Sequence, residues 1–115
     1  MILQYHGNRV PISRLPGMFG EMATPPLPPS TETDRALLER VARGEDRALA
    51  SLYDRYSAVL YAVAFRISGE RPDAEEIVLD SFSQAWRDAA RFQAERGSVI
   101  AWLTMICRSR ALDLV

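Results

Sequence analysis

The sequence predicts an all-α protein, a compact helical bundle of about four helices preceded by a disordered N-terminal extension. Three observations predict this fold. From residue 34 onward, apolar residues recur at steps of three and four, which is the period of a helix and not of a strand. Gly44 and Gly69 stand where helices should end, and Pro72 suits the first turn of the next helix. Hydrophobic residues make up 48% of the 115 residues, enough for a core of ordinary size.

The N-terminal segment, residues 1–33, differs in composition from the rest of the chain. It holds six of the seven prolines and three of the six glycines, and its apolar residues follow no period. Such a segment should not pack as a helix or a strand. We therefore predict a disordered Pro/Gly-rich head at 1–33 and a single helical domain at 34–115. The lone histidine, His6, lies in the head, where we expect it to be solvated.

Four helices are expected after the head. The first covers about 34–43, with Thr33 or Asp34 as its N-cap, and the second covers 45–68. The third should run from Pro72 to about Phe92, and a polar loop, FQAERGS, separates it from a last helix that begins at Val99.

The third helix has a core face and an acidic face when its residues are placed at about 100° per residue. The expected core face contains Ala74, Ile77, Val78, Ser81, Ala85, Ala89 and Phe92, and the acidic face contains Asp73, Glu76, Asp80, Ser83, Gln84 and Arg87. Leu79 and Trp86 form a small apolar ridge of their own. On composition alone, a solvated face with Trp86 packed on a neighbour is favoured. The alternative is a docking surface, because an acidic strip beside an aromatic residue suits a basic partner helix.

The last helix also has two faces. Val99, Ile100, Leu103, Ile106, Cys107, Ala111 and Leu114 should face the core, and Trp102, Met105, Ser109 and Leu112 form the second face. Arg110 falls within the core face, so we expect its head to reach the edge or to pair with an acid of a neighbouring helix, because an unpaired buried charge is costly. Cys107 is expected to fill core space.

Charge and cysteine content exclude several classes of protein. The formal net charge is −1, without the basic excess of proteins that hold duplex DNA through its phosphates. A single cysteine allows no internal disulfide, and this fits a reducing cytoplasm. No metal-ligand spacing, phosphate loop or nucleophile–base pair is visible, so neither a metal, a cofactor nor an enzyme is predicted. No apolar run is long enough to cross a membrane.

The segment DAEEIVLDSFSQAWRDAARF, followed by a glycine-containing polar loop and then AWLTMICRSRALD, resembles conserved region 2 of bacterial sigma factors, most closely the extracytoplasmic-function type. The resemblance covers about 34–115. It implies a promoter-recognition subunit of RNA polymerase, located in the cytoplasm. Its third helix would dock on the coiled-coil clamp helices of the beta-prime subunit, and its loop and last helix would open and read the minus-ten promoter element.

The resemblance also assigns roles to residues. Glu76 and Asp80 match the acidic docking positions, whereas Leu79 departs from the glutamine common in the family. The full expected polymerase-binding set is Glu76, Asp80, Ser83, Trp86 and Arg87. The expected DNA-binding set, for the non-template strand of the minus-ten element, is Arg91, Phe92, Gln93, Glu95, Arg96, Gly97, Ser98, Trp102, Arg108 and Ser109. Ser109 departs from the family's asparagine.

Base stacking on Trp102, arginine contacts to phosphates and close-approaching polar groups of the loop would suit a melted strand. An anti-sigma protein would be a further partner. In the family a linker and a second domain normally follow, so we expect an isolated or truncated domain. The alternative function is a regulatory or scaffold bundle that binds only protein.

Overall fold

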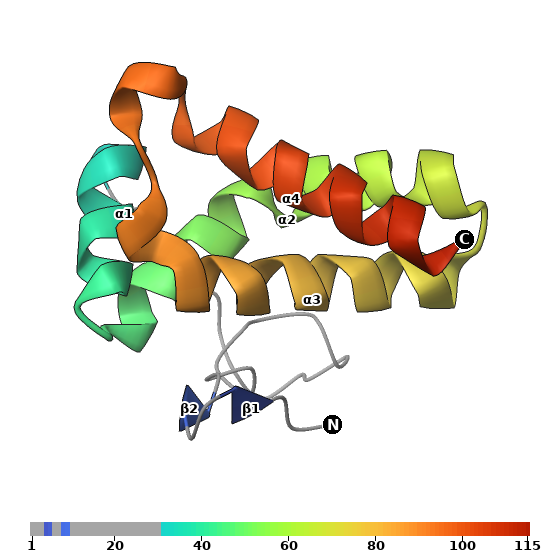
Figure 1. Cartoon of the computed structure of the whole chain (residues 1–115), viewed down its shortest axis with the longest axis horizontal. Helices are drawn as coiled ribbons and strands as arrows, with labels where there is room; N and C mark the ends of the chain where they lie inside the picture. The colour runs from blue at the N-terminus through green and yellow to red at the C-terminus, as the bar shows by residue number, and fades with distance from the viewer. Residues whose placement is uncertain (1–3, 6–7, 10–30) are drawn as a thin grey trace.

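The computed structural model describes residues 4–5, 8–9 and 31–115. Four helices make up most of the described chain: α1 (Asp34–Ala42), α2 (Asp46–Ser68), α3 (Arg71–Asp88) and α4 (Val99–Leu114). They form the predicted helical bundle, in which α3 and α4 cross the front of the view, α2 lies behind α4 and α1 closes one end (Figure 1). Within the described residues, no helix is long and apolar enough to cross a membrane.

Two short strands lie within the segment that was expected to form none. β1 (Gln4–Tyr5) pairs antiparallel with β2 (Asn8–Arg9). A ladder of two residues needs only local pairing, and it is far below the size that is stable alone. The rest of the predicted head up to residue 30 lies outside the described residues, so its predicted disorder stays a prediction.

The start of α1 is tied to α2 by polar contacts. The Thr33 hydroxyl oxygen accepts a hydrogen bond from the Ala36 N–H at 3.0 Å, which confirms Thr33 as the N-cap. The guanidinium of Arg55 in α2 donates to the Asp34 carboxylate at 2.6 Å and to the Glu32 carbonyl at 3.0 Å. Residues on both sides of the predicted boundary at 33 therefore hold α1 in place.

The helix ends follow the glycines for a stereochemical reason. Gly69 adopts a left-handed conformation (φ 75°), and its N–H donates to the Phe65 carbonyl at 2.8 Å. The third helix ends earlier than predicted, at Asp88, and continues as the 3₁₀ turn η2 (Ala89–Arg91). Tightening into a 3₁₀ turn is common at a helix C-terminus, and here it redirects the chain toward α4.

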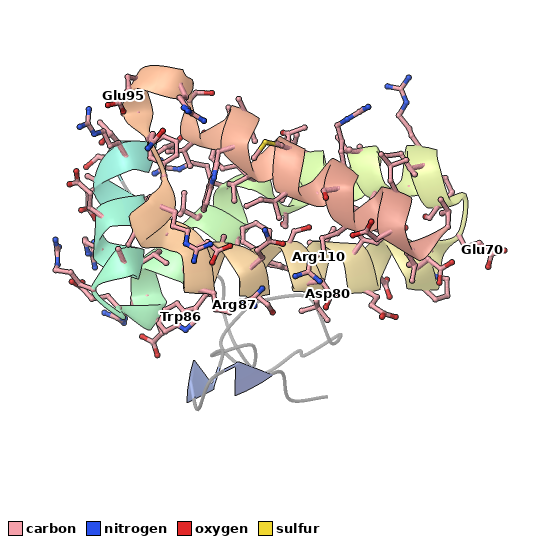
Figure 2. All side chains as sticks on the ribbon, viewed as in Figure 1. Glu70, Asp80, Trp86, Arg87, Glu95 and Arg110 are labelled. Carbon is pink, nitrogen blue, oxygen red and sulfur yellow. The ribbon has the colours of Figure 1, made fainter. Side chains whose placement is uncertain are left out.

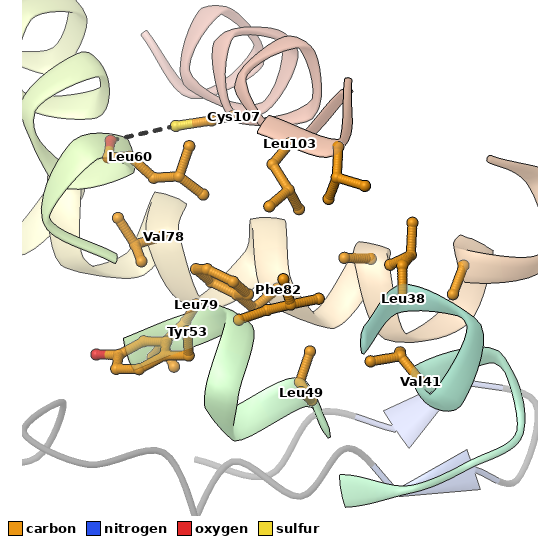
Figure 3. Close-up of a cluster of buried hydrophobic side chains, with 14 of the residues drawn as sticks. Leu38, Val41, Leu49, Tyr53, Leu60, Val78, Leu79, Phe82, Leu103 and Cys107 are labelled. Carbon is orange, nitrogen blue, oxygen red and sulfur yellow. Dashed lines mark hydrogen bonds between the residues drawn. The ribbon is translucent and has the colours of Figure 1, made fainter. Parts of the chain in front are cut away.

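The core is built around α3, which contacts all three other helices. Phe82 is fully buried, and its ring meets the ring of Tyr53 edge-on, with centroids 5.1 Å apart (Figure 3). Phe82 was not on the expected core face, and Leu79, expected on a separate ridge, is also buried. A helix with neighbours on several sides buries a wider arc than the single stripe that periodicity predicts.

Cys107 fills core space, as expected. Its side chain is fully buried, and its thiol donates to the Leu60 carbonyl at 3.4 Å (Figure 3). Burial raises the pKa of the thiol, which keeps the sulfur in its unreactive form. By contrast, the expected burial of Leu114 is wrong: the side chain is 44% exposed, in the last turn of α4, where the neighbouring residues Leu112 and Asp113 are exposed too.

Candidate nucleic-acid and protein interfaces

The connection from α3 to α4 is a structured loop. After η2 and two extended residues, a second 3₁₀ turn, η3 (Ala94–Arg96), leads to Gly97, whose φ of 144° lies in a region open to glycine. Ser98 is the N-cap of α4, and its hydroxyl oxygen accepts from the Ala101 N–H at 3.1 Å. The cap and the glycine fix how the loop enters α4.

An aromatic pair joins this loop to α4. The Phe92 and Trp102 rings meet edge-to-face, with centroids 5.7 Å apart and planes at 68°. Both side chains are half-buried and pack against the hydrophobic core. Each ring therefore has one part anchored and one part available to a ligand.

A pocket of about 420 Å³ opens beside this pair. Its walls come from the loop and from one face of α4, and they are formed by Arg91, Phe92, Gln93, Arg96, Gly97, Ser98, Ala101, Trp102 and Met105. Most of the DNA-binding residues expected from the sequence thus line one cavity. Its volume lies in the range of sites that hold a small molecule or a single chemical group.

Three expected DNA-binding residues lie outside this pocket. Glu95 lies on the outer bend of the loop and lines a different hollow, which it shares with residues of α1 (Figure 2). Arg108 is exposed and lines a second hollow along α4. Ser109 is exposed and lines neither the pocket nor that hollow.

Two lining residues, Ala101 and Met105, were not in the expected DNA-binding set, although Met105 was expected on the second face of the last helix together with Trp102. Met105 lies three residues after Trp102, and Ala101 lies one helical turn before Met105, so the helical period placed them beside the tryptophan. Neither side chain carries a charge or a hydrogen-bonding group, which is why an argument from polar chemistry passes over them.

The charge at the pocket is positive. Arg91 and Arg96 are both exposed and both line it, so their guanidinium groups are available to anions at its rim. Cations beside aromatic rings are the chemistry with which proteins bind single-stranded nucleic acid, because the rings stack on bases and the cations meet phosphates.

The acidic face of α3 is the second candidate surface. Glu76 is exposed, whereas Asp80 is half-buried and lies beside Arg110 of α4 (Figure 2). Burial raises the pKa of the Asp80 carboxyl, the charge of Arg110 opposes that rise, and the nearby Glu76 adds to it. Ionised Asp80 is thus held in a site that disfavours its charge.

Arg110 links α4 to the acidic face of α3. Its Nε donates to the Gln84 side-chain oxygen at 2.9 Å, and its charge acts on Asp80. The sequence predicted an acid of a neighbouring helix or an exposed edge for this arginine. The structure provides an amide as its hydrogen-bond acceptor and a carboxylate close by, both from α3.

The other expected docking residues differ in their exposure. Ser83 was expected on the acidic face, and that placement is wrong: Ser83 is fully buried, and its hydroxyl donates to the Leu79 carbonyl at 2.9 Å. A serine with its hydroxyl bonded one turn back can be buried at little cost. Trp86 and Arg87 are half-buried, and Trp86 packs against the core. The part of the acidic face open to a partner is therefore narrower than the sequence indicated.

Within residues 31–115, no group of three or more His, Cys, Asp or Glu side chains could hold a metal ion.

Residues 52–115, which include the pocket, α3 and α4, match the family Sigma-70 region 2. The chain belongs to this family. The sigma region 2 chain is also 35% identical over 89 residues to the ECF RNA polymerase sigma factor SigK of Mycobacterium ulcerans, covering 76% of this chain and 48% of that protein. Over 89 residues, the chain is also 34% identical to the SigK protein of Mycobacterium tuberculosis H37Rv, which covers 76% of this chain and 48% of that protein. It is 35% identical over 89 residues to the SigK protein of Mycolicibacterium vanbaalenii, covering 77% of this chain and 45% of that protein. The chain spans about half the length of these relatives.

Proposed function

We propose that this sigma region 2 chain is the promoter-binding module of an RNA polymerase sigma factor of the extracytoplasmic-function type. It acts in the cytoplasm, where it docks on the beta-prime clamp helices of the polymerase core through the acidic face of α3. The loop and α4 hold the melted non-template strand of the minus-ten element.

The observation that carries the proposal is the convergence of the loop and α4 on one pocket. Phe92 comes from the loop and Trp102 from the helix, and their rings meet at its wall. Arg91 and Arg96 bring positive charge to the same place. A base removed from its stack needs an apolar or aromatic wall for its face and cations for its phosphates, and this pocket has both.

The docking half of the proposal rests on the α3 face. Glu76 and Asp80 lie one helical turn apart, so their carboxylates lie on the same side of the helix and can meet a basic partner helix. Trp86 and Arg87 lie two turns further along α3, where they would add an aromatic ring and a guanidinium to the contact with the same partner helix. Any anti-sigma partner that inactivates this module would have to cover the acidic face or the pocket.

The test is a titration of labelled single-stranded and duplex oligonucleotides with minus-ten-like sequences. The single strand should bind better than the duplex, because opening a duplex costs pairing and stacking that this small surface does not repay. Trp102→Ala should lower single-strand affinity at least about fivefold, since stacking is worth about 1–3 kcal/mol per base. Because few phosphates are contacted, affinity should fall only gently as salt rises.

A matched control is available in Phe65, an aromatic residue of α2 that is 43% exposed and stacks on Tyr61 with centroids 6.0 Å apart. Phe65→Ala removes an exposed aromatic ring without touching the pocket, so its single-strand affinity should equal that of the parent. Preference for duplex, or an unchanged affinity in Trp102→Ala, would overturn strand capture at this pocket, and no binding to either oligonucleotide would favour the alternative of a helical bundle that binds only protein.

A further inference from the structure

The outer side of α2 carries an exposed apolar strip. Leu60 and Ala64 are fully buried on the side of the helix that faces the core, whereas Ala58 and Ala62 lie on the opposite side and are exposed. No charged residue occurs between positions 56 and 65. A helix face that stays in solvent normally carries charged or polar residues, so this strip lacks the usual composition of a solvated surface.

Larger side chains border the two alanines. Val59 lies on one side of them and is exposed. On the other side lie the rings of Tyr61 and Phe65, which stack with centroids 6.0 Å apart and planes at 13°. Because Ala58 and Ala62 are the smallest side chains of the strip, a partner helix can come closest to α2 over them.

Opposite charges stand at the two ends of the strip. Asp54 and Arg66 continue the spacing of the alanines at steps of four residues, so the four side chains form one row along the helix surface. Both charged residues are exposed, and neither forms an ion pair with another residue of 31–115. The row therefore begins with a negative charge, ends with a positive charge and is apolar in between.

A row of this kind is complementary to itself. In a two-fold dimer, a residue of one copy that faces a second residue of its partner is matched by the reverse contact. When two α2 helices run antiparallel about an axis level with residue 60, Ala58 faces the partner's Ala62 and Asp54 faces the partner's Arg66. Rows with a four-residue step align when helices cross at about 50°, the commonest crossing in globular proteins. Both ends of the contact then hold an attractive pair.

We propose that the outer side of α2 is a self-association surface, through which two copies of this chain form an antiparallel two-fold dimer. Tyr61 and Phe65 of both copies cover one edge of the contact, and Val59 of both copies covers the other. Two crossing helices touch over only a few turns, so the buried area lies below about 1,200 Å² and the dimer is transient.

This inference goes beyond the proposed promoter-binding function and does not depend on it. None of the residues that line the pocket belongs to α2, so the pocket stays open in the dimer.

The test exchanges the charges at the two ends of the row. Sedimentation equilibrium of the full chain over a wide concentration range should show reversible association of monomers to dimers. Asp54→Arg and Arg66→Glu should each weaken the dimer at least about fourfold, because the two-fold axis turns both attractive pairs into like-charge pairs.

Two further samples should restore the dimer. A chain that combines Asp54→Arg with Arg66→Glu again has opposite charges at both ends of the contact, so it should associate like the parent. An equimolar mixture of the two single variants should do the same through mixed dimers. Arginine and glutamate are good helix formers, so these variants should keep the parent's helicity by circular dichroism.

Glu95→Arg is the matched control, because it makes the same charge change at an exposed residue of the loop and not of α2. It should associate like the parent. Phe65→Ala tests the apolar part of the contact: it should weaken the dimer severalfold while leaving single-strand affinity unchanged.

Each contrary outcome overturns a stated part of the proposal. A chain that stays monomeric at every concentration would overturn the self-association and leave the outer side of α2 to solvent or to a different protein. Association that neither single charge variant weakens would overturn the assignment of the dimer to α2. A loss that the combined variant and the mixture both fail to restore would overturn the antiparallel register. Since oligonucleotide binding is measured separately, none of these results bears on the proposed function.

Discussion

The two candidate surfaces of this domain are built in opposite ways. The α3 face belongs to a regular helix in the middle of the bundle, and Asp80, Trp86 and Arg87 are half-buried parts of it. The loop that forms the pocket leaves most of its polar side chains in solvent, including Arg91, Gln93, Arg96 and Ser98. One surface is positioned by packing, and the other is positioned by a cap, a glycine and one aromatic pair.

This difference separates stability from binding. A partner helix that docks on α3 meets groups whose geometry the core already holds, so little order has to be gained on binding. The outer part of the loop, from Gln93 to Ser98, is mostly exposed, and such segments open at low cost, which suits a site that has to admit a base. Substitutions of the packed residues of α3 should therefore act mainly on stability, whereas substitutions in the loop should act mainly on binding.

The largest expected effect comes from truncating a core side chain of α3, because the α3 face depends on packing. Phe82→Ala should lower the free energy of unfolding by about 3–5 kcal/mol, because the ring is fully buried and leaves a cavity. Chemical denaturation followed by circular dichroism measures this loss, with the exposed Leu112→Ala as the control expected to stay within about 0.5 kcal/mol. A small loss for Phe82→Ala would mean that the core collapses readily around α3 and that the face above it is not rigid.

The docking face itself is tested by reversing its charge. Glu76→Lys combined with Asp80→Lys should weaken binding to an isolated beta-prime clamp fragment by at least about tenfold, because like charges across an interface cost several kcal/mol. Helicity, followed by circular dichroism, should not change. Surface plasmon resonance measures the affinity.

Glu95→Lys combined with Asp113→Lys is the control, since it makes the same charge change at two exposed acids away from the α3 face. It should bind like the parent. Because Asp80 lies beside Arg110, Glu76→Lys alone decides the question if the double variant loses helicity. Unaltered clamp binding in these variants would remove the acidic face from the proposed function.

A backbone substitution tests whether the geometry of the loop shapes the pocket. Gly97 has φ 144° and Gly69 has φ 75°, and a Cβ added to either would meet no atom within 4 Å. Both Gly→Ala changes therefore act through backbone strain alone, about 1–3 kcal/mol. Gly69→Ala should lower thermal stability without changing single-strand affinity. Gly97→Ala should lower single-strand affinity severalfold and stability less, because the loop can relax by moving. Equal affinity for the two variants would show that loop geometry does not shape the pocket.

The smallest expected effect concerns Asp80 and pH. Because its pKa is raised on folding, the folded state holds the proton more tightly than the unfolded chain, and ionised Asp80 lowers stability at neutral pH. That penalty disappears as pH falls through the folded pKa and below the unfolded value of about 3.9. Asp80→Asn should therefore raise the melting temperature at pH 7 by about 1–3 °C, and the gain should vanish below about pH 3.

Calorimetry across that pH range checks this, with Glu75→Gln as the control at an exposed acid of the same helix. A lower melting temperature for Asp80→Asn at pH 7 would mean that attraction to Arg110 outweighs burial. A gain at neutral pH would show that ionised Asp80 lowers the stability of the fold.

Much of the fold followed from local signals. The helices could be predicted from the sequence alone, because their signals involve only a few neighbouring residues. These signals are the helical spacing of apolar residues, the N-cap at Thr33 and the helix end at Gly69. The burial of Phe82 and Ser83 could not, because it depends on how many helices surround α3. A helical period predicts the direction of the buried stripe and does not predict its width.

The same division applies to the candidate sites. The sequence by itself determined which residues have the chemistry to bind DNA or a basic helix, since charge and aromaticity are properties of each side chain. Only the tertiary structure decided which of them meet: it brought Phe92 to Trp102, separated Glu95 from the pocket and added Ala101 to its wall. A pocket is formed by segments that approach one another in space, and their approach depends on the packing of the whole bundle.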